Sequence, residues 1–261
     1  MLSMKMELQI ALGSTALFVS ILLAASRRIR SVSRASFLIS TVHAITILAL
    51  TSYVIFSECW DSHSSFCNFN ASSNSDVQQG ILLYSMGYFI TDSIVVLWVA
   101  PDLSAALHHV SILFGQFFAV FYGDFQEGRE GRIFGYPGIS GYALACFLFA
   151  AEVSAPFLNT FMSGLAPSGT RFEFISKALF ASTFLISRLV VCPFLLYEFV
   201  VNCPNAPIVP KAVCVFVMGI SVYWSKAVIA GVGEAVLPPQ STVKDLIKIE
   251  EELREKRLKG E

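Results

Sequence analysis

Two adjacent histidines, His108 and His109, lie inside an apolar segment and are the residues best suited to acid–base or nucleophilic chemistry. Imidazole changes its charge near neutral pH, so it can act as a general base or as a nucleophile. Asp92 lies inside the preceding apolar segment, just before a short Pro-Asp break at residues 101–102. Ionisable groups are costly in hydrocarbon and usually face a bundle interior or a wet cavity. The histidine pair and Asp92 are therefore candidates for a functional site.

Other polar side chains lie within the remaining apolar segments: His43, Glu152, Asn159 and Arg188. At about 1.5 Å of rise per residue, the histidine pair is roughly 7 Å from the cytosolic end of its helix, Glu152 roughly 16 Å and Arg188 about 22 Å. We expect Asp92 and Glu152 to support the histidines in catalysis. We expect His43, Asn159 and Arg188 to line a substrate cavity that opens to the cytosol.

The bland alternative is that each polar residue only bonds a neighbouring helix, which contributes about 1–2 kcal/mol at most. This structural alternative stays open, most of all for His43. Adjacent helical residues point about 100° apart, so at most one residue of the histidine pair is expected to face the centre of a cavity.

The composition predicts a polytopic membrane protein. Hydrophobic residues make up 55% of the 261 residues and charged residues 14%, whereas a soluble domain would carry roughly a quarter charged residues. Stretches of about 20 apolar residues predict an all-α bundle of transmembrane helices. The seven predicted segments are 8–25, 36–56, 80–100, 104–122, 139–163, 173–197 and 210–232.

The first segment could instead be a cleaved signal peptide, but its length and the arginines that follow it favour a retained helix. The net charge of −1 argues against a nucleic-acid partner. Membrane lipids are the expected partners, and a homodimer stays open. The six cysteines have no metal-ligand spacing, so we expect neither a metal nor a cofactor.

The distribution of charge between the loops predicts the orientation. Arginines crowd the first short loop, which places that loop in the cytosol and the N-terminus in the lumen. The next loop, 57–79, has no Lys or Arg and contains a glycosylation sequon at Asn70. Cys59 and Cys67 flank part of this loop and could form a disulfide if it is lumenal. The basic tail predicts a cytosolic C-terminus, and its last residues, 257–261, resemble a dibasic retrieval signal of the endoplasmic reticulum.

Five pieces of the chain together resemble the TLC domain, which is shared by ceramide synthases, the translocation-associated TRAM proteins and several small TLC-domain proteins. These pieces are Ser40–Ala44 with His43, Gly87–Asp92, His108-His109, Glu152–Asn159 and the segment around Arg188. The resemblance covers about 30–232, between a first helix with its basic loop (1–29) and a charged cytosolic tail (233–261). It implies a helical barrel around a cytosol-facing cavity.

The resemblance also suggests two functions. Ceramide synthases transfer a fatty acyl group from acyl-CoA to a sphingoid-base amine with a histidine pair, which His108 and His109 match. However, residues 142–151, before Glu152, contain no His or Asp, unlike that group. The Glu152–Asn159 piece is more similar to the small TLC-domain proteins, which are linked to membrane lipid composition. We therefore expect a lipid-homeostasis protein of the endoplasmic reticulum, with an acyl-CoA-dependent acyltransferase, acyl-CoA being its substrate, as the alternative. A seven-helix receptor is disfavoured, because nothing receptor-like is found at the helix ends.

Overall fold

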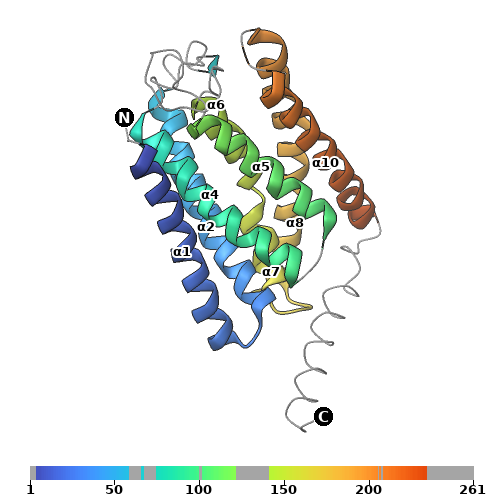
Figure 1. Cartoon of the computed structure of the whole chain (residues 1–261). Coiled ribbons are helices and arrows are strands. Elements are labelled where there is room, and N and C mark those ends of the chain that lie inside the picture. The colour runs from blue at the N-terminus through green and yellow to red at the C-terminus, as the bar shows by residue number, and fades with distance from the viewer. Residues whose placement is uncertain are drawn as a thin grey trace.

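The computed structural model describes residues 4–58, 66–67, 75–99, 102–121, 141–204, 206 and 208–233, and within these residues every regular element is a helix (Figure 1). The predicted all-α class is therefore confirmed. The elements are α1 (Met4–Ile29), α2 (Val32–Glu58), α4 (Asp76–Trp98), α5 (Leu103–Phe121), α6 (Gly141–Glu152), α7 (Ala155–Met162), α8 (Arg171–Ile186), η4 (Ser187–Val191), α9 (Cys192–Tyr197), η5 (Glu198–Asn202) and α10 (Ile208–Gly233).

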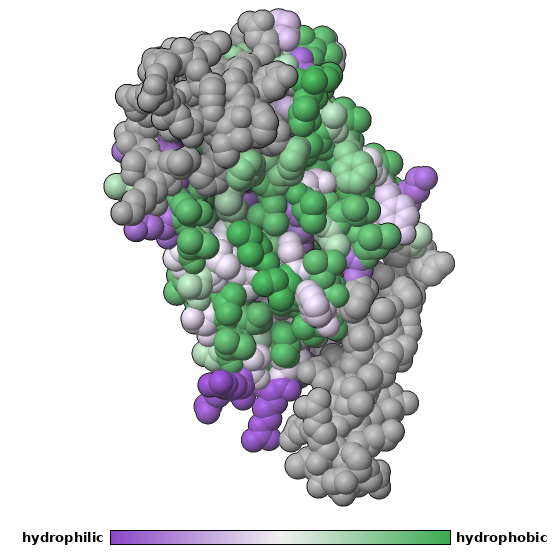
Figure 2. Space-filling model, in the orientation of Figure 1, coloured by the Kyte–Doolittle hydropathy of each residue, from purple (hydrophilic) through white to green (hydrophobic). Residues whose placement is uncertain are grey.

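The helices pack side by side into one bundle. α4 contacts α1, α2 and α5, while α5 also contacts α10, and α6 and α7 both pack on α2. Six helical spans of the described chain are long and apolar enough to cross a membrane. α5, with 19 residues, lies where the fourth predicted segment was expected. Large apolar side chains cover the described part of the visible face, and hydrophilic ones gather at its lower end (Figure 2). The chain therefore fits an integral membrane protein with six to seven spans.

The fifth predicted segment is one span broken into two helices. α6 ends at Glu152, residues 153–154 form a turn, and α7 begins at Ala155. Pro156 is the cause, since it has no N–H to donate to the carbonyl four residues earlier and its ring crowds that carbonyl. The break leaves carbonyl groups at the end of α6 without helical partners.

The sixth predicted segment is longer than expected and runs from Arg171 to Asn202. Two π-helical turns interrupt it. In the first of them, η4, the Cys192 N–H donates to the Ser187 carbonyl five residues earlier. Pro193 follows at once and lacks a donor. Such single turns often occur at functional sites, and η4 carries Arg188.

Helices α1 and α4 approach closely at Gly87. The Ser14 hydroxyl donates to the Leu83 carbonyl of α4 at 3.1 Å. A Cβ on Gly87 would overlap the Ser14 side chain and lie 2.6 Å from the backbone nitrogen of Thr15. The glycine of the Gly87–Asp92 piece is therefore required by packing, and this contact fixes the helix that carries Asp92.

The disulfide of the bundle joins Cys67 to Cys203, whose Cα atoms lie 5.3 Å apart. The expectation that Cys67 pairs with Cys59 is wrong, while Cys59 itself and Asn70 lie outside the described residues. Cys67 precedes α4 and Cys203 follows η5, so two connections far apart in sequence meet at one end of the bundle (Figure 1). Closeness in sequence did not identify the pairing, because a disulfide needs Cα atoms that lie about 4.4–6.8 Å apart in the fold.

We predict that Gly87→Ala destabilises the protein, because the added methyl group forces α1 and α4 apart. Overpacking of this kind typically costs about 1–3 kcal/mol. Gly80→Ala is the matched control on the same helix, since nothing lies within 4 Å of a Cβ placed there. Thermal unfolding of both variants in detergent should show a lower Tm for Gly87→Ala only. Equal Tm values would contradict the close approach.

Candidate functional site

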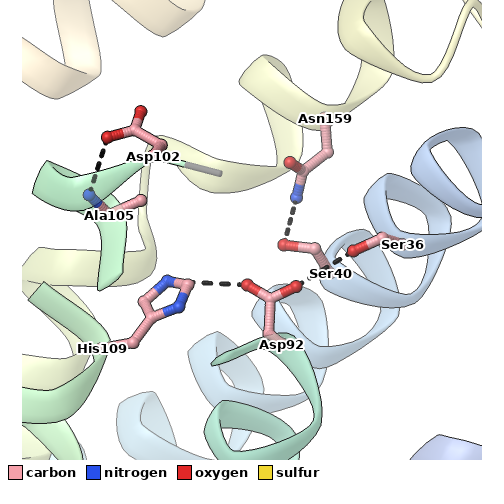
Figure 3. A network of polar contacts seen from close by, with 7 residues as sticks. All are labelled: Ser36, Ser40, Asp92, Asp102, Ala105, His109 and Asn159. Carbon is pink, nitrogen blue, oxygen red and sulfur yellow. Dashed lines mark hydrogen bonds and ion pairs between the residues drawn. The ribbon is translucent and has the colours of Figure 1, made fainter. Parts of the chain in front are cut away.

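Asp102 fixes the start of the helix that carries the histidine pair. Its Oδ1 accepts hydrogen bonds from the Ser104 hydroxyl at 2.7 Å and from the backbone N–H groups of Ser104 and Ala105 at 2.8 and 3.1 Å (the Ala105 bond is drawn in Figure 3). Burial acts to raise the pKa of Asp102, but these hydrogen bonds outweigh it and bring the pKa below its ordinary value. A negative charge at this helix N-terminus is favourable and sets the first turn of α5.

The two histidines point to different neighbours. His108 is buried, lines a cavity and packs its ring edge-on against Trp224 of α10, with 4.9 Å between ring centroids. His109 turns towards α4, where its Nε2 lies 3.5 Å from Asp92 Oδ2 and its ring packs against Phe89. The prediction that at most one of the pair faces a cavity is confirmed, and that residue is His108.

Asp92 belongs to a polar network that joins α2, α4, α5 and α7 (Figure 3). Its Oδ1 accepts a hydrogen bond from the Ser36 hydroxyl at 3.0 Å, opposite the oxygen that faces His109. One turn further along α2, the Ser40 hydroxyl accepts a hydrogen bond from Asn159 Nδ2 at 2.8 Å. The Tyr88 side chain interacts with both Ser40 and Asp92. These contacts hold the four helices in register and orient the imidazole of His109.

His43 lies outside the cavity, in an aromatic cluster between α1, α2 and α4. Its ring is fully buried and stacks on Tyr88, with centroids 3.7 Å apart and an interplanar angle of 15°. Phe18 and Phe89 pack against it edge-on. His43 is not part of the wall of this cavity, because the face of α2 that carries it is covered by α1 and α4. Asn159 likewise bonds α2 and is not part of the cavity wall.

Arg188, on η4, is buried between α6 and α10. It is 5% exposed, and its Nη2 donates to the Ala151 carbonyl at 3.1 Å while its Nη1 lies 3.4 Å from the Ser221 hydroxyl of α10. Ala151 belongs to the last turn of α6, whose carbonyls are left free by the break before Pro156. A cation at the carboxyl end of a helix is also favoured by the helix dipole. Arg188 is thus buried against the carboxyl end of α6, next to the break before Pro156.

Neither of the two carboxylates, Asp92 and Glu152, is part of the cavity wall. Asp92 is engaged by His109 and Ser36, on the far side of α5 from the cavity. Glu152 is buried beside Ala151 and interacts electrostatically with Arg188. Arg188 therefore acts electrostatically on one carboxylate but hydrogen-bonds to a backbone carbonyl and a hydroxyl group.

The cavity lies between α5, α6, the η4–α9 segment and α10, and measures about 90 Å³. One water needs about 10–15 Å³ on this measure, so there is room for several waters or for part of an acyl chain. His108, Arg188 and Ser221 lie close together on its wall, and Ser111 and Gln116 are further polar groups of the wall. Most of the remaining wall is apolar and includes Ile112, Leu144, Phe147, Leu196 and Val217.

The depths inferred from the sequence do not describe how the helices are staggered. Trp224 Nε1 donates to the Ser104 hydroxyl at 3.0 Å, while Ser221 bonds Arg188. Ser221 and Trp224 are three residues apart on α10, which is about 4.5 Å along the axis. The start of α5 and Arg188 therefore lie at nearly the same level, although Arg188 was placed about 15 Å deeper than the histidine pair.

Sequence reasoning missed the contribution of α10 to the site. Ser221 and Trp224 reach Arg188 and the first turn of α5, yet both lie in a helix that reads as a plain membrane span. The available signal was Ser221 followed by Ser225 at a spacing of four, which marks one buried face. Within the described ranges, no group of His, Cys, Asp and Glu side chains could hold a metal ion.

Residues 29–129 match the TLC domain model of the TRAM, LAG1 and CLN8 proteins. This confirms the resemblance over α2, α4 and α5, which carry His43, Asp92 and the histidine pair, without assigning the chain to one subgroup. No curated relative and no solved structure matches the chain. The match shows a TLC domain over these residues, and the apolar helices fit an integral membrane protein.

We predict that Asp92 and His109 are energetically coupled and that Asp92 and His108 are not. A cycle of Asp92→Asn, His109→Gln and the double variant should give a coupling free energy of roughly 0.6–2 kcal/mol in thermal or denaturant unfolding. The same cycle with His108→Gln is the control, because His108 faces the other side of α5. Additivity in the His109 cycle, or equal coupling in both cycles, would contradict the geometry.

Proposed function

We propose that the protein acts in membrane lipid homeostasis by binding the acyl chain of a lipid in the cavity between α5, α6, α9 and α10. The observation that supports this is the composition of its wall, which is mainly apolar and carries His108, Arg188 and Ser221 close together, with Ser111 and Gln116 as further polar groups. Ligand pockets are typically apolar with a few placed polar groups that fix orientation. An acyl chain with a polar head matches both parts of this wall.

A binding role is favoured over catalysis by a His–Asp pair. A general base works best when a second group orients it and when it reaches the reacting atom. His109 has such a partner in Asp92 but does not line the cavity, whereas His108 lines the cavity and packs on Trp224 rather than on a carboxylate. His109 therefore has an orienting partner and His108 has access to the cavity, but neither residue has both.

The alternative function is an acyl-CoA-dependent acyltransferase, and one observation favours it. His108 Nδ1 is buried and has no hydrogen-bond partner, so its imidazole can receive a proton or attack a thioester carbonyl. In that reaction His108 would remove the proton from an acceptor amine as the amine replaces the CoA thiolate. The reaction requires acyl-CoA to reach the level of Arg188.

We predict that Gly115→Phe abolishes the effect of the protein on the cellular lipid profile, because the new ring occupies the cavity. Gly115 lines the cavity, and nothing lies within 4 Å of a Cβ placed on it. Gly219→Phe is the matched control, since Gly219 is exposed on α10 and equally unhindered. Lipidomics of cells that express each variant at equal membrane abundance is the measurement.

His108→Ala, tested in parallel, separates the two functions. Binding alone predicts that His108→Ala keeps a large part of the lipid effect that Gly115→Phe removes. Acyl transfer predicts that both variants lose it, because removal of a general base typically costs about a hundredfold or more in rate. An unchanged lipid profile with Gly115→Phe would refute a role for the cavity.

We further propose that the protein resides in the endoplasmic reticulum with its N-terminus in the lumen and its C-terminus in the cytosol. The Cys67–Cys203 disulfide supports this, because disulfides persist in oxidising compartments. The disulfide lies at the end of the bundle opposite the α1–α2 junction, where Arg27, Arg28 and Arg34 gather (Figure 1). Basic residues favour the cytosolic side.

This orientation predicts a glycan on Asn70 and a C-terminal epitope that antibodies reach after selective permeabilisation of the plasma membrane. Asn70→Gln should remove the gel shift that endoglycosidase treatment also removes. In non-reducing gels, Cys67→Ser and Cys203→Ser should each abolish the same mobility difference, while Cys146→Ser should retain it. An epitope that is protected until the internal membranes are opened would reverse the orientation.

A further inference from the structure

The charge of Arg188 is not neutralised by any group that it hydrogen-bonds. Its Nη2 bonds a backbone carbonyl and its Nη1 bonds a hydroxyl group, and its side chain also interacts with that of Cys192. Its Nε is buried and has no hydrogen-bond partner. Guanidinium groups buried in proteins are normally paired with carboxylates or phosphates, often through two parallel bonds. A donor and a charge are therefore available at the polar end of the cavity.

Glu152 does not supply the missing partner. It is the carboxylate that acts on Arg188 electrostatically, yet the two side chains form no ion pair within 4 Å in the described part of the chain. Glu152 is also not part of the cavity wall, whereas Arg188 is. Arg188 and His108 both line this cavity, and each has one buried nitrogen, Nε and Nδ1 respectively, without a hydrogen-bond partner.

The cavity extends along the helices that line it, α5, α6, α9 and α10. Its polar end is formed by His108, Ala151, Arg188 and Ser221. From there its wall continues towards Gly115 on α5, Leu144 on α6, Leu196 on α9 and Val213 on α10, and it includes the polar side chain of Gln116, whose Nε2 donates to Ser85. Val213 and Ser221 are eight residues apart, so the wall extends for about 12 Å along α10. This is the form of a site for a head group at one end and a hydrocarbon chain beyond it.

We infer that the cavity binds a single-chain amphiphile with a compact anionic head, a carboxylate or a phosphate, held by Arg188 and oriented by His108. This inference rests on the proposed function and adds the charge of the head group to it. The anion would neutralise the guanidinium and accept the Nε–H, while the chain would lie against the apolar wall. A neutral lipid of the same chain length would leave both Arg188 Nε and its charge unmatched.

The test uses the full chain in lipid nanodiscs and a photoactivatable fatty acid with a free carboxylate. Unlabelled oleate and oleoyl lysophosphatidic acid compete as a carboxylate and a phosphate, oleyl alcohol as the neutral chain, and oleoyl-CoA as the thioester. Because a hydrogen bond to a charged group contributes about 1.5–3 kcal/mol, the anionic competitors should be roughly tenfold or more stronger than the alcohol. The ratio of oleate to lysophosphatidic acid shows which anionic head the site prefers.

Two pairs of variants accompany the competition. Arg188→Gln should remove the preference for anions and keep binding of the alcohol, with Lys226→Gln on the exposed face of α10 as its control. Gly115→Phe should remove binding of every chain, with Gly219→Phe as its control. If Arg188→Gln does not fold, the ratio of anion to alcohol in the wild-type protein decides the question alone.

The outcomes separate the inference from the function on which it rests. Equal competition by oleate and oleyl alcohol, with loss of both in Gly115→Phe, would overturn the anionic head and leave the acyl-chain site intact. Labelling that Gly115→Phe does not reduce would overturn the site itself. Competition by oleoyl-CoA far above that by oleate would replace the compact anion with a thioester and favour the acyltransferase.

Discussion

The burial of the Arg188 charge is the constraint on which the arrangement of this bundle depends. A guanidinium in an apolar environment has to be hydrogen-bonded, because an unpaired buried charge costs several kcal/mol or more. One acceptor is the Ala151 carbonyl in the last turn of α6, which ends before Pro156. The π turn η4 carries Arg188, and the hydroxyl of Ser221 is a second acceptor for it. A proline break, a π turn and a serine on three helices thus serve one cation.

Helix geometry explains why His108 and His109 face different neighbours. Helical neighbours point in different directions, so α5 can present one imidazole to the cavity and the other to Asp92. His109 and Asp92, with Ser36, fasten α5 and α4 to α2, while Gly87 sets the distance from α4 to α1. The first half of the bundle therefore forms a rigid support. The cavity lies on the other side of α5, where the apolar wall and the arginine meet.

The helices themselves could be predicted from the sequence, because apolar runs of sufficient length have few alternatives in a membrane. The involvement of His108 and Arg188 could also be predicted, since polar groups in such runs are costly and rarely face lipid. The location of His43 could not, because a histidine buried by aromatic rings has the same sequence signal as one that faces a cavity. The pairing of Cys67 with Cys203 and the level of α5 depend on helix tilt and stagger, which no local pattern encodes.

The central claim is that a lipid occupies the cavity between α5, α6, α9 and α10. Its most direct test is an electron cryo-microscopy structure of the full chain purified with its native lipids. The account predicts elongated density along Gly115 and Val217, with its broader end against Arg188 and His108. Density confined to the outer surface of the helices, with side chains filling the space beside Gly115, would contradict it.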